Sequence, residues 1–318
     1  MYAAQDLHGV MAMMPAFATA DAADIDATST IAVDNLQQGV DRIIKDGVDV
    51  IATTGSFGEF HTLLDEEFQT IIQATIEAVH QRVPLFLGCT ALNSRDVVRK
   101  MRFIRDAGGQ GVLVGVPFYF PSTVENAVEF YRQIGEMFPS LSIMVYHNPA
   151  LHNVTLPVDA FNRLVQIPNV VAMKDSHRQT AEMLKLHKII EGKISQFCFQ
   201  GQYYPYAQLG AAGCWSIDAW MGPWPLLALR DAVQRGDTEL ARELTMDLTS
   251  GGEGGGLQWR ETAAKIAIGY AGYCKPGPLR PPFVKIPENV IEGAKRRAAY
   301  WQTLCDKARP HVKERVLV

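Results

Sequence analysis

The sequence has few of the features that mark secreted proteins or cysteine-based metal sites. Its 318 residues include five cysteines, and no two of them form a C-x-x-C pair. An odd number of widely spaced cysteines argues against a disulfide framework and against a cysteine zinc site. We therefore expect reduced cysteines in a cytoplasmic protein.

Long hydrophobic runs and an excess of one charge are also missing. No stretch approaches the roughly 20 apolar residues of a transmembrane helix. The segment 1–17 lacks the positive region and apolar core of a signal peptide. Lys and Arg number 30 against 34 Asp and Glu, a net charge of −4, and no basic run occurs. We therefore expect neither a membrane nor nucleic acid as a partner.

Common ligand-binding motifs are absent as well. The glycine-rich segment 250–256 precedes no Gly-Lys-Ser/Thr, which predicts a flexible loop and not a phosphate cradle. No histidine pair has metal-ligand spacing on one helix: His147 and His152 flank a loop, and His177 follows an apolar run. A metal-dependent reaction is therefore disfavoured.

Eight short apolar runs alternate with longer amphipathic segments. The runs cover residues 11–19, 48–55, 84–90, 111–118, 142–148, 170–176, 197–201 and 213–218. Most are continuous, which is typical of strands buried on both faces of a parallel sheet. Helices are expected at 34–45, 65–80, 94–107, 124–138, 181–190, 237–248, 259–270 and 288–308.

This alternation predicts an α/β protein built as a (β/α)8 TIM barrel. The barrel, with the active site, is expected over residues 1–235, and a C-terminal helical extension over 236–318. An open doubly wound sheet is the alternative, although no glycine-rich turn follows the first run. In a barrel the active site lies at the carboxyl ends of the strands, so the polar residues there are the candidates.

Lys174 is the first candidate, because it interrupts an apolar run. A buried ammonium is costly, so burial favours the free amine, which is a nucleophile that condenses with ketones. A lone strand-end lysine more often reaches solvent or pairs with a neighbour such as Asp175.

The preceding run ends in VYHNP. Side chains alternate along a strand, so Tyr146 and Asn148 share one face. If that face is the barrel interior, both lie beside Lys174, and the Tyr146 phenol can carry protons. A buried tyrosine hydrogen-bonded to backbone is the simpler alternative.

The segment 53–63 places glycines and hydroxyls at a strand-to-helix turn. Such a turn presents backbone N–H groups that suit a carboxylate. We interpret Glu59 as a residue that holds this loop together.

These motifs resemble those of the dihydrodipicolinate synthase / N-acetylneuraminate lyase superfamily, the pyruvate-dependent class I aldolases. The segment 55–59, GSFGE, is similar to the family's carboxylate-binding loop, which implies that Gly55, Ser56 and Phe57 bind substrate. Tyr146 resembles its proton-relay tyrosine and Lys174 its Schiff-base lysine, at the family's interval. The resemblance covers nearly the whole chain and implies a homotetramer, with Tyr119 matching a further relay tyrosine.

Residues that differ from the family's pattern indicate which subfamily the chain resembles. The synthase has an arginine where this chain has Leu151, and a threonine where it has Phe57. Aromatic residues near the strand ends, which are Phe57, Phe118, Phe120, Trp215, Trp220 and Trp224, favour an aromatic aldehyde over a sugar polyol. Phe57 and Asn148 resemble the hydratase-aldolases of bacterial aromatic degradation.

The resemblance therefore implies cleavage of a benzylidenepyruvate-type substrate to an aromatic aldehyde and pyruvate. Asn148, Tyr119, Trp215 and Ser216 are further substrate-binding candidates, and no metal or cofactor is expected because the imine is the electron sink. A 2-keto-3-deoxy sugar acid aldolase or dehydratase and a dihydrodipicolinate synthase-like enzyme are alternatives. A non-catalytic barrel that binds a keto acid is the alternative outside enzymes.

Overall fold

Eight strands close into a barrel in the computed structural model of the chain, which describes residues 1–250 and 257–312. They are β1 (Gly9–Met13), β2 (Val50–Thr53), β3 (Leu85–Gly88), β4 (Gly111–Val114), β5 (Ser142–His147), β6 (Val170–Asp175), β7 (Ser195–Phe199) and β8 (Gly213–Ser216). Each strand from β2 to β7 pairs in parallel with the next. The predicted (β/α)8 barrel is confirmed, and the open-sheet alternative is wrong.

The strands overlap the apolar runs, most of whose residues are buried. Every residue of β1 to β6 is buried, as expected for strands covered on both faces. The first strand ends earlier than the run at 11–19 predicts. Pro15 stands two residues after Met13 and has no N–H to donate to a neighbouring strand.

The helices follow the predicted amphipathic segments closely. They are α1 (Val33–Lys45), α2 (Asp65–Val79), α3 (Ser94–Asp106), α4 (Val124–Met137), α5 (Pro149–His152), α6 (Phe161–Leu164), α7 (Thr180–Ile190), α8 (Tyr203–Ala207), α9 (Trp224–Arg235), α10 (Thr238–Ser250), α11 (Leu257–Ala271) and α12 (Glu288–Ala308). Helix α9 and the short helices α5, α6 and α8 were not predicted. Residues 225–232 of α9 are all buried, so this helix lacks the polar face that an amphipathic pattern requires.

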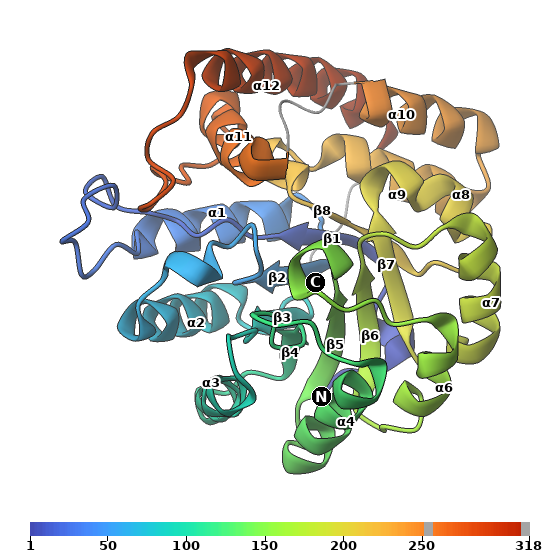
Figure 1. Cartoon of the computed structure of the whole chain (residues 1–318). Helices are drawn as coiled ribbons and strands as arrows, with labels where there is room; N and C mark the ends of the chain where they lie inside the picture. The colour runs from blue at the N-terminus through green and yellow to red at the C-terminus, as the bar shows by residue number, and fades with distance from the viewer. Residues whose placement is uncertain (251–256, 313–318) are drawn as a thin grey trace. The chain divides into compact units, whose positions relative to one another are not determined.

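Contacts within the chain divide it into two compact units. The first comprises Met1–Met11, Asp49–Gly55 and Pro84–Trp215, and the second Ala12–Val48, Ser56–Val83 and Ser216–Val318. In the first unit α3, α4 and α7 lie outside the strands, and in the second α11 packs along α12 (Figure 1). The expected division of the chain at residue 235 stays a prediction. The glycine-rich segment expected to be a loop lies outside the described residues from position 251 onward.

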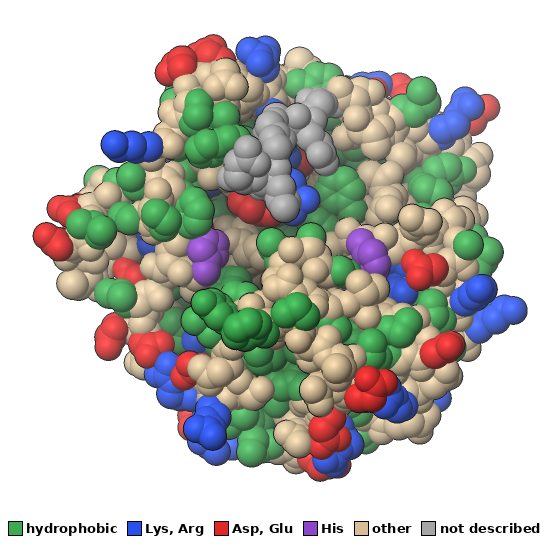
Figure 2. All heavy atoms as spheres, viewed as in Figure 1, with side chains coloured by type: hydrophobic (Ala, Val, Ile, Leu, Met, Phe, Trp, Pro, Cys, Tyr) green, Lys and Arg blue, Asp and Glu red, His purple; other side chains and the backbone are tan. Residues whose placement is uncertain are grey.

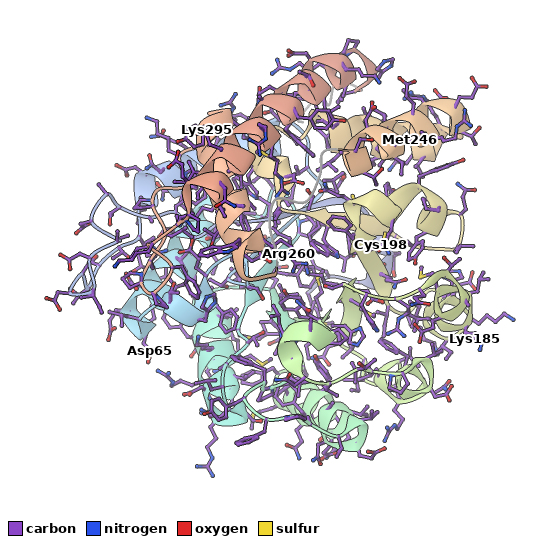
Figure 3. All side chains as sticks on the ribbon, turned by 45° about the horizontal axis from the view of Figure 1, so that its top comes forward. Asp65, Lys185, Cys198, Met246, Arg260 and Lys295 are labelled. Carbon is purple, nitrogen blue, oxygen red and sulfur yellow. The ribbon has the colours of Figure 1, made fainter. Side chains whose placement is uncertain are left out.

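The mixed charges on the surface and the reduced cysteines agree with the expectations from the amino-acid composition. Lys and Arg side chains are interspersed with Asp and Glu over the face seen in Figure 2. All five cysteines, Cys89, Cys198, Cys214, Cys274 and Cys305, are free and buried, and Cys198 lies on β7 (Figure 3). Within residues 1–250 and 257–312, no helix is both long and apolar enough to cross a membrane.

Gly88 on β3 provides a test of the barrel packing. A Cβ atom there would lie 2.3 Å from the Thr54 carbonyl oxygen and 2.6 Å from that of Thr53. These are backbone atoms at the end of β2, so they cannot move aside cheaply. We expect Gly88→Ala to lower the free energy of unfolding by about 1–3 kcal/mol, measured by denaturant titration.

The matched control is Gly269→Ala on α11, where an added Cβ would meet nothing within 4 Å. Alanine in a helix interior should raise the free energy of unfolding by up to about 1 kcal/mol. Equal stability of the two variants would contradict the packing described for Gly88.

Candidate active site

The pairing of β5 with β6 places Tyr146 beside Lys174. The two residues are direct partners in the parallel register, and His147 is the partner of Asp175 one position further on. Because side chains alternate, Tyr146 and Lys174 point to one side of the strands and His147 and Asp175 to the other. The structure thus brings together the two residues that the sequence singled out on neighbouring strands.

Lys174 is enclosed by aromatic rings. Its side chain is 3% exposed, and Nζ lies 3.6 Å from the ring centroid of Trp215 and 4.4 Å from that of Tyr146. The amine also donates to Ser176 Oγ over 3.2 Å. Trp215 is fixed in turn, since its indole N–H donates to the Asp175 carbonyl oxygen over 2.8 Å. Ring faces attract a cation while they exclude water, so this is a dry and defined place for an amine.

Lys265, in the second unit, is the only other buried lysine among residues 1–250 and 257–312. Its ammonium donates to the carbonyl oxygens of Ala16 (3.0 Å) and Pro278 (2.7 Å) and to Glu59 Oε1 (2.5 Å). Burial lowers the pKa of Lys265 to about 8, although Glu59 opposes the shift. Three acceptors occupy all three donors of an ammonium, so Lys265 is held as a structural cation. Lys185, by contrast, extends into solvent from α7 (Figure 3).

Asn148 is buried next to the Tyr146 phenol. Its amide nitrogen donates to the Tyr146 hydroxyl over 3.4 Å. Asn148 is also the residue before α5, but its side chain does not cap that helix. The amide is therefore directed to the phenol, on the face that strand alternation predicts.

His152 on α5 packs against Tyr146, and sequence reasoning missed it. The two rings are perpendicular with centroids 4.7 Å apart, and His152 Nδ1 lies 3.1 Å from the Tyr146 carbonyl oxygen. A Cβ at Gly115 would come within 2.3 Å of the imidazole. Burial lowers the pKa of His152 to about 4, and the Lys174 charge adds to this. The only sequence signal is Gly115, which makes room for the ring, and its partner cannot be identified from spacing.

The loop that follows β2 is pinned through Glu59. Glu59 has a left-handed backbone (φ +53°), and its N–H donates to the Ser56 carbonyl oxygen over 3.0 Å. Its buried carboxylate accepts hydrogen bonds from Lys265 and, over 2.8 Å, from Arg280 Nη1. Ser56 and Phe57 are buried in the same unit. Glu59 is thus a loop-holding residue by its geometry, as expected.

The remaining predicted residues have different surroundings. Gly55 is buried at the end of the β2 segment of the first unit. Tyr119 is 73% exposed, with its ring 5.2 Å from that of Phe120. Ser216 ends β8, and its hydroxyl accepts from the Ala219 N–H over 3.2 Å. Tyr146, Asn148, Lys174 and Trp215 therefore form the cluster that the structure assembles in the first unit.

A group with potential metal ligands lies on the opposite side of β5 and β6. One ligand atom each of His147, Asp175 and His177 lies within 4.8 Å of the others. However, His147 Nδ1 lies 3.1 Å from Asp175 Oδ1, and its Nε2 accepts from the Leu156 N–H over 3.0 Å. Both imidazole nitrogens are thus engaged, so a metal would have to displace existing hydrogen bonds.

Comparison with known proteins places the chain in a family. The family model described as the dihydrodipicolinate synthetase family matches residues 13–297. The chain belongs to this family. It is 31% identical over 316 residues to a trans-o-hydroxybenzylidenepyruvate hydratase-aldolase of Pseudomonas putida, with 95% of each chain covered. A trans-2'-carboxybenzalpyruvate hydratase-aldolase of Nocardioides sp. (strain KP7) is 27% identical over 318 residues, again with 95% of each covered.

A solved structure agrees with these relatives. The structure described as PhdJ bound to substrate intermediate matches with a TM-score of 0.90 and 28% identity, covering 96% of this chain and 99% of that one. The resemblance to this family and to its hydratase-aldolases is confirmed. The chain is therefore an enzyme, a lyase of the aldolase type.

The low pKa of His152 predicts an acid-dependent loss of stability. The folded state keeps His152 neutral down to about pH 4, whereas an unfolded histidine takes up a proton near pH 6.5. The unfolded state then binds more protons between these values, so stability falls as the pH falls. Between pH 8 and pH 5 we expect the wild type to lose about 2 kcal/mol more unfolding free energy than His152→Gln, measured by denaturant titration.

The control is His8→Gln, at an exposed histidine. It should keep the pH dependence of the wild type. A wild-type pH dependence in His152→Gln would show that His152 is not held neutral in the folded protein.

Proposed function

We propose that this enzyme is a class I hydratase-aldolase that cleaves a benzylidenepyruvate-type 2-keto acid to an aromatic aldehyde and pyruvate. The observation that carries the proposal is the buried amine of Lys174 between the rings of Tyr146 and Trp215. An amine in such a place forms an imine with a ketone, and the protonated imine accepts an electron pair when a neighbouring carbon–carbon bond breaks. The names of the relatives support the reaction type.

The first step forms the imine. Lys174 Nζ, as the free amine, attacks the ketone carbon of the substrate and gives a carbinolamine. The carbinolamine loses its hydroxyl as water, and an iminium remains. Tyr146 is the proton carrier, because its ring lies beside Nζ and a phenol can donate to the departing oxygen and take the proton back.

The second step hydrates the conjugated alkene. The iminium withdraws electrons, so water adds at the benzylic carbon and a proton adds at the carbon next to the iminium carbon. Asn148 has an amide that reaches the Tyr146 hydroxyl, and we assign it to position this water. The product is a benzylic alcohol still bound to Lys174.

The third step breaks the carbon–carbon bond. The benzylic hydroxyl loses its proton to Tyr146, an aromatic aldehyde leaves, and the bonding pair moves into the iminium to form an enamine. The enamine takes a proton on carbon, and water hydrolyses the resulting imine to pyruvate and free Lys174. The iminium supplies the electron sink, so we expect the reaction to proceed without a metal or organic cofactor.

The loop residues and aromatic residues supply the proposed binding sites. We assign the substrate carboxylate to Gly55 and to the backbone donors of Ser56 and Phe57. The aromatic half fits the apolar character of Phe57 and Trp215, and Leu151 lacks the charge of the synthase's arginine. Tyr119 and Ser216 remain candidates for substrate binding. The homotetramer that the resemblance implies and the cytoplasmic location expected from the cysteines remain predictions.

Borohydride trapping tests the imine. With pyruvate and sodium borohydride, we expect irreversible inactivation and a mass gain equal to pyruvic acid less one oxygen atom. Peptide mapping should place the adduct on Lys174, because it is buried among aromatic rings while Lys265 is held by three acceptors. Lys174→Ala is the negative control. An adduct on Lys265 or on the exposed Lys185 in place of Lys174 would overturn the assignment.

A substrate panel tests the aldehyde half. We expect substituted benzylidenepyruvates to be consumed, with loss of their ultraviolet absorbance and release of pyruvate. In the reverse direction, pyruvate with benzaldehyde or salicylaldehyde should be at least about tenfold better, by kcat/KM, than pyruvate with glyceraldehyde, because an apolar site favours an aryl group. A preference for glyceraldehyde would favour the sugar-acid aldolase instead.

A further inference from the structure

Behind the Tyr146–Lys174 pair lies a second pair, His147 and Asp175, which the proposed mechanism does not use. Both side chains are 2% exposed, and they are partners one register position beyond Tyr146 and Lys174. His147 Nε2 accepts from the Leu156 N–H, so the imidazole carries its proton on Nδ1 and donates it to Asp175 Oδ1 over 3.1 Å. A directional hydrogen bond therefore joins the ends of β5 and β6 on their outer side.

Asp175 extends this connection to the next two strands. Its Oδ2 accepts from Gln196 Nε2 on β7 and from Arg178 Nε, each over 2.9 Å. Its carbonyl oxygen accepts from the indole of Trp215 on β8, the same ring that covers Lys174 Nζ. Asp175 thus holds one residue from each of the strands β5, β7 and β8.

The charges within this network are balanced. Burial by itself would raise the pKa of Asp175, but hydrogen bonds from His147 and His177 and the charge of Arg178 bring it below its usual range. Arg178 is buried and also donates to the Leu156 carbonyl oxygen over 3.0 Å. A buried carboxylate with this many donors keeps one rotamer, because any other rotamer would leave several polar groups unsatisfied.

We propose that His147 and Asp175 are positioning residues that set the alignment of Tyr146, Lys174 and Trp215 for imine chemistry. The inference rests on the proposed function, since it assumes that Lys174 forms the imine. The alternative for the same residues is a divalent metal site with His177. Metal binding there would be costly in free energy. A cation would have to displace the hydrogen bonds of His147 with Leu156 and with Asp175, next to the positive charge of Arg178.

The main test compares two replacements of His147. His147→Phe keeps a flat ring but cannot donate to Asp175, and His147→Asn keeps a short donor. We expect His147→Phe to lower kcat by about 10- to 100-fold with KM within about threefold, because small misalignments of reacting groups cost rate more than binding. The rate of borohydride trapping with pyruvate should fall in parallel. The kcat of His147→Asn should be at least about tenfold higher than that of His147→Phe.

His177→Phe is the matched control. His177 is the exposed member of the group, and Asp175 keeps its bonds to His147, Arg178 and Gln196 without it. If His147 and Asp175 are positioning residues, His177→Phe should have a kcat within about threefold of the wild-type value. A metal site predicts that His147→Phe and His177→Phe fail alike, that EDTA removes activity, and that added Zn²⁺ restores it. This second pattern would overturn the proposal.

A second variant covers the case in which His147→Phe does not fold. Gln196→Met removes one donor from the far side of Asp175 and keeps the length of the side chain. We expect kcat to fall about threefold to tenfold with KM unchanged, at a folded fraction checked by circular dichroism. A folded His147→Phe with a wild-type kcat would overturn the proposal, and where that variant does not fold, a folded Gln196→Met with a wild-type kcat would overturn it. A wild type that gives no pyruvate adduct would instead overturn the proposed function.

Discussion

The parallel pairing of β5 with β6 is the constraint on which the rest of the site depends. In that register a single step along the strands separates the inner pair, Tyr146 and Lys174, from the outer pair, His147 and Asp175. The inner pair meets aromatic rings, and the outer pair meets a set of buried donors. A slip of one strand by one residue would turn its side chains to the opposite side, because side chains alternate with a period of two, and it would separate Tyr146 from Lys174 and His147 from Asp175. The register of β5 with β6 therefore determines which side chains can meet at the proposed reaction site.

The two buried lysines show how surroundings decide the role of the same side chain. Lys265 is surrounded by oxygen acceptors, which favour a fixed ammonium. Lys174 contacts the ring faces of Tyr146 and Trp215 and donates to the Ser176 hydroxyl. Burial alone would not distinguish them. The atoms within contact distance distinguish the two lysines. They identify Lys265 as a structural cation and Lys174 as a candidate nucleophile.

The sequence predicted the barrel and the central pair because both follow from local patterns. Continuous apolar runs identify buried parallel strands, and Lys174 and Tyr146 stand at the ends of two of them. The contacts of His152, and the pairing of His147 with Asp175, depend on register and on helix placement, which no local pattern encodes. Helix α9 was missed for a related reason, since a helix buried on all sides loses its periodic signal. The exposure of Tyr119 likewise follows from the fold and not from its neighbours in the sequence.

The anchoring of Glu59 has a consequence for how the protein is made. Its partners Lys265 and Arg280 follow it by 206 and 221 residues. Contacts between such distant segments form late, because a long loop must close before they contribute. During synthesis on the ribosome, the strands that carry Tyr146 and Lys174 emerge well before the residues that pin the Ser56–Phe57 loop. A nascent chain can therefore complete this loop only when most of its length has left the ribosome, which places the ordering of the loop among the last events of folding.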